Sequence, residues 1–275
     1  KGEQDSFTFT GTAGQQLFFD TLNTTNYFPI TVYDPTGKLI DGFDSRSNRG
    51  PNSPLFLAKT GTYKVTVDGS GEDTGAYKFR FLDRDAATPV NLDTPITGNF
   101  DSALNNLDAK SYSFVIPAVP VTASQNGKQY IYIDGTGGTA YNRYNIYNEA
   151  GVNVSNGYIY EDRELYLDAG SYWLELNGTG ASDSSFNVQI ITAPLTTTAM
   201  NLGDTVSGTI AKKGEQDSYT FNGTAGRQLF FKTLNTTNPF TITVYDPTGK
   251  QIDSFSSTSD RGTAFTPLFI SLTGT

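Results

Sequence analysis

The chain has 275 residues and a mass of 29.8 kDa, which at roughly 100–150 residues per domain predicts two or three domains. It carries 19 Lys and Arg against 28 Asp and Glu, a formal net charge of -9, so nucleic acid would be repelled. Histidine and cysteine are both absent. That absence excludes Ser-His-Asp and Cys-His nucleophiles, zinc sites of the usual ligands, haem ligation by His or Cys, and disulfides.

The predicted elements are short strands from the start of the chain. Runs of about five residues alternate apolar and polar side chains, as in residues 63–67, 77–81 and 242–245. Turn sequences such as Asp34-Pro-Thr-Gly37 separate them. No apolar run reaches the roughly 18 residues that span a bilayer, so we expect a soluble chain without membrane insertion. The pattern predicts an all-β fold of tandem antiparallel β-sandwich, jelly-roll-like modules.

An internal repeat organises the chain. Residues 1–9 recur almost unchanged at 213–221, and the match continues from residues 30–38 to 242–250. A diverged copy lies between them, with Ser111-Tyr-Ser-Phe114 in the place of Ser6-Phe-Thr-Phe9. We therefore predict module A (1–87), module B (88–198, diverged and Tyr-rich) and module A′ (199–275).

The outer modules are predicted to be incomplete. Modules B and A′ each open with a strand that A lacks, at residues 95–100 and 205–210. Module A′ stops before counterparts of residues 63–67 and 76–81. Two interpretations stay open: the sequence is a window on a longer array, or strands of neighbouring chains fill the gaps.

Four spaced motifs carry a family resemblance. They are a Gly-Glu-x-Asp-Ser-Tyr/Phe-Thr-Phe strand, a Gly-x-x-Leu-Phe-Phe strand, a Tyr-Asp-Pro-x-Gly-Lys turn, and a Thr-Gly-Thr-Tyr-x-Val-x-Val-Asp-Gly strand. Together they resemble the bacterial pre-peptidase C-terminal domain. The resemblance implies a β-sandwich found on secreted proteases and, in tandem, in very large bacterial surface proteins. It also implies that calcium, collagen or polysaccharide binding could occur. Module B departs most, since residues 148–151 replace the Asp-Pro-Thr-Gly turn.

Acidic residues at strand ends form the candidate metal sites. Calcium takes six to eight oxygen ligands, and no other cofactor is expected. Two interpretations are open: the acidic side chains ligate calcium, or they solvate the turns. The candidate ligands are Glu3, Asp5, Asp34, Asp68, Glu72, Asp73, Glu215, Asp217 and Asp246.

Aromatic residues of module B form the candidate partner surface, which comprises Trp173, Tyr158 and Tyr160. Aligning residues 171–176 with 62–67 places Trp173, the only tryptophan, on the outward phase of its strand. Trp173 should then be exposed, or covered by something other than its own core. Exposed rings stack on sugars or anchor interfaces; contact with the adjacent module is the alternative. In residues 17–19 the side chains on both sides of the strand are apolar. We therefore expect both faces of this strand to be covered by other parts of the protein.

These features predict a non-catalytic structural repeat of a large extracellular or cell-surface bacterial protein, serving spacing, fibre formation or adhesion. Its partners would be copies of itself or adjacent modules, with glycans or extracellular matrix as further candidates. The alternative function is that of accessory modules of a secreted hydrolase, which would bind a polysaccharide or collagen-like ligand with or without calcium.

Overall fold

The computed structural model describes residues 2–46, 54–69, 71–101, 108–118, 127–137, 142–178, 184–192, 196–234, 238–258, 260–261 and 267–275. The chain divides into two compact units, one of residues 1–194 with 211–215 and one of residues 195–210 with 216–275. The described elements are β-strands apart from one short 3-10 helix, η1 (Arg84–Ala86). Among these residues no helix is long and apolar enough to cross a membrane. The all-β prediction is confirmed.

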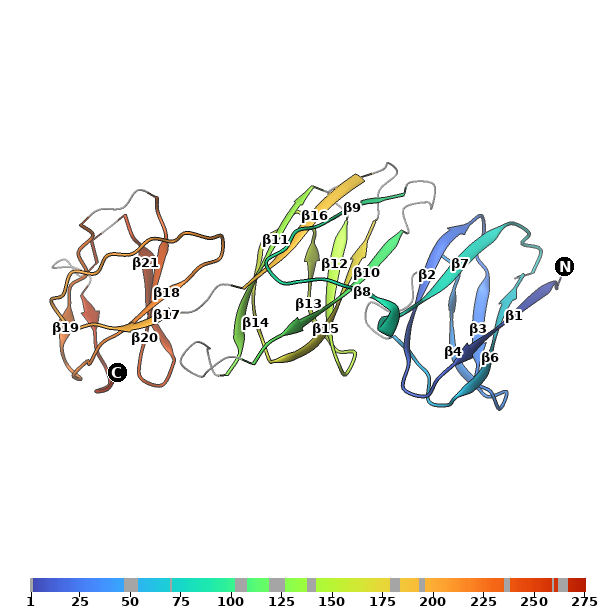
Figure 1. The fold of residues 1–275 in the computed structure, drawn as a ribbon, viewed down its shortest axis with the longest axis horizontal. Helices are drawn as coiled ribbons and strands as arrows, with labels where there is room; N and C mark the ends of the chain where they lie inside the picture. Colours follow the sequence, from blue (N-terminus) through green and yellow to red (C-terminus); the bar gives the residue numbers. More distant parts are fainter. Residues whose placement is uncertain are drawn as a thin grey trace. The chain divides into compact units, whose positions relative to one another are not determined.

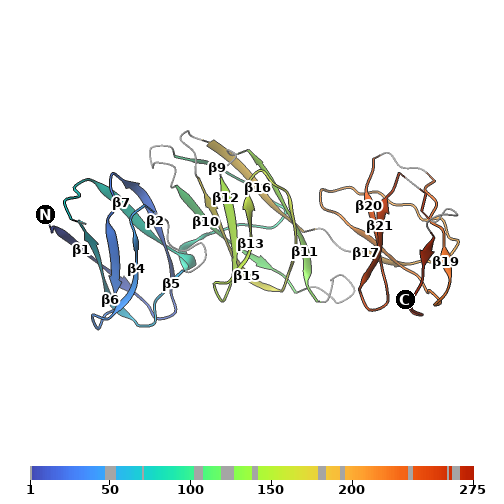
Figure 2. The ribbon, with the colours of Figure 1, turned by 180° about the vertical axis from the view of Figure 1, so that it is seen from behind.

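Module A is a sandwich of two antiparallel sheets (Figures 1 and 2). The larger sheet has the order β1-β6-β3-β4 and the smaller one the order β5-β2-β7. The strands are β1 (Gln4–Gly11), β2 (Gln16–Thr24), β3 (Pro29–Tyr33), β4 (Leu39–Asp44), β5 (Leu55–Phe56), β6 (Gly61–Asp68) and β7 (Tyr77–Asp83).

Alternation of apolar residues builds the core of module A. On β6, Tyr63, Val65 and Val67 are buried between the two sheets. They meet Phe19 of β2 and Val32 of β3 in one apolar cluster. These strands form because β-branched and aromatic side chains occupy one face at period two.

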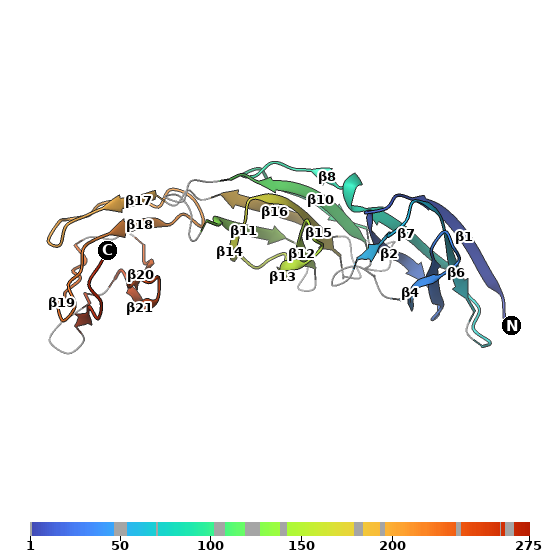
Figure 3. The same cartoon turned by 90° about the horizontal axis from the view of Figure 1, so that it is seen from below.

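Module B repeats this plan with longer sheets. One sheet has the order β13-β12-β15-β10-β8 and the other β14-β11-β16-β9. β8 pairs in parallel with β10 and lies alongside it in Figure 3. The strands are β8 (Thr88–Pro89), β9 (Ile96–Phe100), β10 (Ala109–Ile116), β11 (Gln129–Gly137), β12 (Arg143–Asn148), β13 (Asn153–Tyr158), β14 (Arg163–Leu167), β15 (Gly170–Asn177) and β16 (Ser184–Thr192).

The second unit contains only short ladders among its described residues. β17 pairs with β18 in parallel, β19 with β22 and β20 with β21. The bounds are β17 (Thr196–Ala199), β18 (Asp217–Thr220), β19 (Gln228–Leu229), β20 (Thr241–Tyr245), β21 (Gln251–Ser256) and β22 (Leu268–Phe269).

One predicted strand is not formed. Residues 95–100 do contribute a strand, β9, which pairs with β16. Residues 205–210, their counterpart in the second unit, are exposed and have no strand structure. An edge strand forms only where it can hydrogen-bond to a neighbour. The described part of the second unit holds no counterpart of β16, the strand with which β9 pairs.

Candidate functional site

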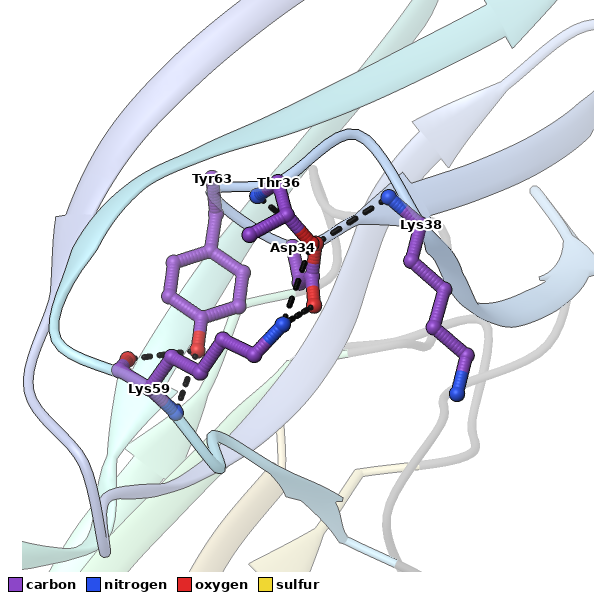
Figure 4. A network of polar contacts seen from close by, with 5 residues as sticks. All are labelled: Asp34, Thr36, Lys38, Lys59 and Tyr63. Carbon is purple, nitrogen blue, oxygen red and sulfur yellow. Dashed lines mark hydrogen bonds and ion pairs between the residues drawn. The ribbon is translucent and has the colours of Figure 1, made fainter.

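The Asp34 turn of module A is a closed polar network (Figure 4). Asp34 Oδ1 accepts hydrogen bonds from the backbone N–H groups of Thr36 and Lys38, at 2.8 and 3.0 Å. Lys59 Nζ donates to Asp34 Oδ2 at 2.6 Å. The Tyr63 hydroxyl in turn donates to the Lys59 carbonyl at 2.6 Å. Asp34 therefore fastens the β3–β4 turn to the segment that leads into β6.

The donors of this network stabilise the ionised form of Asp34. The hydrogen bond from Lys59, followed by that from Thr36, holds the pKa of Asp34 well below its ordinary value of 3.8. In the second unit Asp246 makes the same turn bonds to Thr248 and Lys250. Leu272 occupies the position that corresponds to Lys59 of module A. The ion pair between lysine and aspartate is therefore present at the turn of module A and not at the turn of Asp246.

The structure does not gather the calcium candidates into a metal centre. Among the described residues, no group of three or more acidic side chains could hold a metal ion. Asp5 accepts a hydrogen bond from the Tyr77 hydroxyl, and Glu215 accepts from the backbone N–H groups of Ala211 and Lys212. Glu3 meets the loop after β6 through its carbonyl, which accepts from Gly69 N–H at 3.0 Å. Of the remaining candidates, Asp68 is half-buried, and Glu72, Asp73 and Asp217 are exposed.

Replacing Asp34 with Ala is expected to lower the Tm of the chain by several degrees, since four donors lose their acceptor: the N–H and hydroxyl of Thr36, the N–H of Lys38 and Lys59 Nζ. Asp246→Ala, the matched control, should lower Tm less because it lacks the lysine. The wild-type contribution should be present above pH 4 and be lost as the pH falls through the depressed pKa of Asp34. Scanning calorimetry with and without millimolar calcium checks this. A calcium-dependent rise in Tm that Asp34→Ala abolishes would instead assign calcium to the turn.

Trp173 lies where module A covers module B. The indole is 2% exposed and makes an edge-to-face contact with Phe18 of β2, with ring centroids 6.2 Å apart. Tyr147 of β12 and Ala109 of β10 complete this cluster. Trp173 is on the outward phase of β15, as predicted, and a neighbouring module covers it. Residues 17–19 are likewise covered on both faces, because Phe19 points into the core of module A and Phe18 into the interface.

An ionic cluster continues the interface beside these rings. Asp20 of β2 is fully buried and pairs with Arg80 of β7 at 2.7 Å. Arg80 Nη2 crosses to module B, where it donates to the Ala109 carbonyl at 2.7 Å and lies 3.5 Å from Asp108 Oδ1. Lys110 Nζ lies 2.7 Å from Asp108 Oδ2. The negative charges of two carboxylates and the positive charges of two cations therefore cancel at this interface.

Glu175 adds a fifth ionisable group to this cluster. It follows Trp173 on the outward phase of β15, is 0% exposed, and accepts a hydrogen bond from the Asn177 amide. Its Oε2 has no hydrogen-bond partner among the described residues, and the same holds for Asp20 Oδ1. Burial raises the pKa of Glu175 from 4.5 to about 8, and the negative charge of Asp20 acts in the same direction.

Burial also raises the pKa of Asp20, to about 7, against the opposing effect of Arg80. Burial therefore favours the protonated form of both carboxyl groups, and the charge of Asp20 favours it further at Glu175. With a proton on Glu175, the cluster of Asp20, Asp108, Arg80 and Lys110 is electrically neutral.

Hydrogen bonds from the Arg84 side chain lie at the rim of the interface near η1. Arg84 Nη1 donates to the Glu149 carbonyl at 2.7 Å and to Gln16 Oε1 at 3.2 Å. Glu149 and Gly151 belong to the turn between β12 and β13. A side chain at Gly151 would lie 2.6 Å from Gln16 Oε1, so this turn approaches β2 closely.

Tyr158 and Tyr160 form a separate aromatic platform on module B. Their rings stack with centroids 5.4 Å apart and an interplanar angle of 19°. The Arg143 guanidinium lies 4.6 Å from the Tyr158 centroid. Tyr160 is 47% exposed, so one ring is available for stacking on a sugar.

The ionic interface residues Asp20, Arg80, Asp108 and Glu175 were not predicted as a site. The sequence holds one signal for them: a charged side chain on the outward phase of a strand that is otherwise apolar on both phases. Glu175 in Trp-Leu-Glu-Leu and Asp20 after Leu-Phe-Phe both fit this description. Which residues face each other across two modules is a tertiary property that strand phase alone does not supply.

Comparison with known proteins identifies the fold of module A. Residues 3–69 match the model of the bacterial pre-peptidase C-terminal domain family. The resemblance predicted from the four motifs is thereby confirmed for most of module A. Pre-peptidase C-terminal domains are accessory domains of secreted bacterial proteins.

Solved structures of low identity accompany this match. The pre-peptidase C-terminal domain of a collagenase from Bacillus anthracis is 14% identical, with a TM-score of 0.30; the match covers 38% of this chain and 93% of that domain. PliG of Aeromonas hydrophila, a periplasmic inhibitor of g-type lysozyme, is 15% identical, with a TM-score of 0.27 and cover of 38% and 96%. The CUB1-EGF-CUB2 segment of human MASP-1/3 is 8% identical, with a TM-score of 0.20 and cover of 68% and 93%. No curated protein matches the chain.

Proposed function

We propose that the chain is a non-catalytic structural array of an extracellular bacterial protein, in which docked β-sandwich modules serve spacing, fibre formation or adhesion. The observation that supports this is the covered face between modules A and B. Phe18 and Trp173 are buried there, and Arg80 joins β7 to β10 through the Ala109 carbonyl. Interfaces with buried aromatic anchors hold domains in one orientation. A spacer needs that property, because a freely jointed chain does not keep a fixed length.

Negative-stain electron microscopy of the purified chain tests the array function. We expect modules A and B to appear together, in the same relative orientation, in every class average. Filaments at higher protein concentration would assign fibre formation, and isolated particles would assign spacing. Class averages in which the two modules take many relative orientations would contradict the proposal.

A second candidate function is glycan binding by module B. The Tyr158–Tyr160 platform supports it, because an exposed ring backed by a stacked neighbour and a cation is pre-organised for a sugar face. A separate cavity of about 400 Å³ is lined by Lys128, Glu164, Tyr166, Asp168 and Tyr172. Its charged and hydroxyl groups suit a polar ligand.

Tyr160→Ala is expected to weaken retention on a polysaccharide gel at least tenfold if the platform binds glycans, since stacking on one ring is lost. Affinity electrophoresis on a panel of neutral polysaccharides measures this. Tyr166→Ala, which alters the cavity and leaves the platform intact, is the matched control. Equal retention of both variants and the wild type would remove the platform from consideration.

A further inference from the structure

The interface between modules A and B contains two carboxyl groups that titrate near neutral pH. Histidine, the side chain that usually does so, is absent from the chain. Burial raises the pKa of Asp20 to about 7 and that of Glu175 to about 8. Each residue follows one that points into the core of its own module, Phe19 in β2 and Leu174 in β15. Strand alternation therefore places both carboxyl groups on outward faces, which the two modules bury against each other.

Glu175 has uncharged neighbours within module B. Ser111 of β10 and Asn145 of β12 stand opposite it in the two ladders of β15. Asn145 Oδ1 accepts a hydrogen bond from Asn153, and the Ser111 hydroxyl has no hydrogen-bond partner among the described residues. The next residue on this face of β12 is Tyr147, and its pKa is raised by burial and by the charge of Glu175. None of these groups neutralises a carboxylate.

The cations of the interface are bound to other acidic groups. Arg80 of β7 pairs with Asp20 and reaches Asp108, and Lys110 of β10 pairs with Asp108. Among the described residues no cation forms an ion pair with Glu175. If all three acidic residues were ionised, three negative charges would therefore stand against two positive ones. An uncompensated charge is costly in a buried interface.

Three further cations lie on the elements around this cluster, and each is engaged or exposed elsewhere. Arg143 of β12 donates to the Tyr158 hydroxyl at 2.9 Å. Arg84 of η1 donates to the Glu149 carbonyl at the rim. Lys78 of β7 is exposed. A proton is therefore the positive charge that makes the buried cluster neutral.

The interface is the least costly place at which water can reach these groups. Among the described residues, its apolar cluster has five buried members, whereas the core clusters of modules A and B have ten and sixteen. Apolar burial scales with the area removed from water. Separation of the modules therefore sacrifices little apolar contact and leaves both cores intact, while it returns both carboxyl groups to water.

We propose that the interface between modules A and B is a proton-controlled joint, which closes when its buried carboxyl cluster holds a proton and opens at alkaline pH. Separation returns the pKa of Glu175 from about 8 to its ordinary value of 4.5. Opening therefore releases a proton between these two pH values. The joint is tightest below pH 4.5, weakens as the pH rises, and is weakest above pH 8. This inference rests on the proposed docking of the modules and adds its regulation.

Hydrogen exchange at the Trp173 indole tests the joint in the intact chain. The indole N–H is buried, has no hydrogen-bond partner among the described residues, and belongs to the only tryptophan. Its protection factor, corrected for the intrinsic exchange rate at each pH, measures the ratio of closed to open interface. We expect it to fall roughly tenfold between pH 6 and pH 7, since opening releases one proton, and to level off above pH 8. The backbone amides of β6 and β15 should stay better protected than the indole throughout.

Glu175→Gln should lose most of this dependence on pH, because the amide does not ionise. Asp20→Asn is the second variant, and it should reduce the dependence by removing the other buried carboxyl group. Glu161→Gln, at an exposed turn position of module B, is the matched control and should behave as the wild type does.

Three results would overturn the proposal. Indole protection that is independent of pH in the wild type would mean that no group of the interface titrates. An undiminished dependence on pH in both interface variants would place the titration elsewhere. Indole protection equal to that of the core amides would mean that the interface opens only when the chain unfolds. An indole without protection at pH 6 is a distinct result, because it would show that the modules are not docked and would remove the proposed function as well.

Discussion

Replacing Glu175 with Gln is expected to raise the free energy of unfolding above pH 8 by an amount on the order of 5 kcal/mol, since each pKa unit corresponds to about 1.4 kcal/mol. Burial holds the pKa of Glu175 at about 8 in the folded chain, against an ordinary value of 4.5. The unfolded chain therefore releases this proton first. The stabilising contribution is complete below pH 4.5, falls as the pH rises, and is lost above pH 8.

Glutamine keeps the shape and the Asn177 contact without a group that ionises. The variant should accordingly lack most of the fall in stability between pH 5 and pH 8. Asp20 contributes a fall of the same sign, because burial also raises its pKa, to about 7. Urea unfolding followed by tryptophan fluorescence measures both, since Trp173 is the only tryptophan and lies in the interface. Glu164→Gln, at an exposed position of β14, is the control.

The opposite result is equally clear for Glu175. If the carboxylate were ionised and paired at neutral pH, Glu175→Gln would destabilise the chain at pH 7 and would not flatten the fall in stability between pH 5 and pH 8. That outcome would mean that Arg80 neutralises Glu175 and that the neutral cluster described above is wrong.

Replacing Trp173 with Ala is expected to cost about 3–5 kcal/mol, the usual effect of removing a buried aromatic side chain. The loss falls on the interface rather than on either core, because Trp173 packs against Phe18, Tyr147 and Ala109. We expect modules A and B of the wild type to unfold together in one calorimetric transition. In Trp173→Ala they should unfold in two separate transitions. Trp173→Phe should restore most of the coupling, since a ring still meets Phe18.

Val115→Ala is the matched control for Trp173→Ala. Val115 is also an apolar outward residue of module B, on β10, but is 62% exposed. Its replacement should leave Tm and the number of transitions unchanged. A single transition at the wild-type temperature in Trp173→Ala would show that the indole does not hold the modules together.

The positions of the strands could be predicted from the sequence better than the strands with which they pair. Period-two alternation located β6 and β7, and the outward phase of Trp173 followed from aligning two copies of one strand. The strand predicted at residues 205–210 failed because pairing, rather than propensity, decides whether a short edge strand forms. Its copy in module B has β16 beside it.

The ionic cluster was beyond sequence reasoning for a related reason. Asp20 and Glu175 each occupy an outward strand position, where a charged residue ordinarily faces water. Only the approach of β2 and β7 to β10 and β15 removes that water and raises both pKa values. Two calcium candidates show the converse, since Asp34 accepts hydrogen bonds from Thr36 and Lys59, and Asp246 from Thr248 and Lys250.

The central claim is that modules A and B are docked in one orientation, and an inter-module distance measurement tests it most directly. The chain has no cysteine, so Thr8→Cys and Val115→Cys introduce two unique sites for spin labels on exposed strand positions of the two modules. Pulsed electron paramagnetic resonance at pH 6 should give one narrow distance distribution, which broadens when Trp173→Ala is added. A broad distribution in the chain that retains Trp173 would contradict a fixed interface.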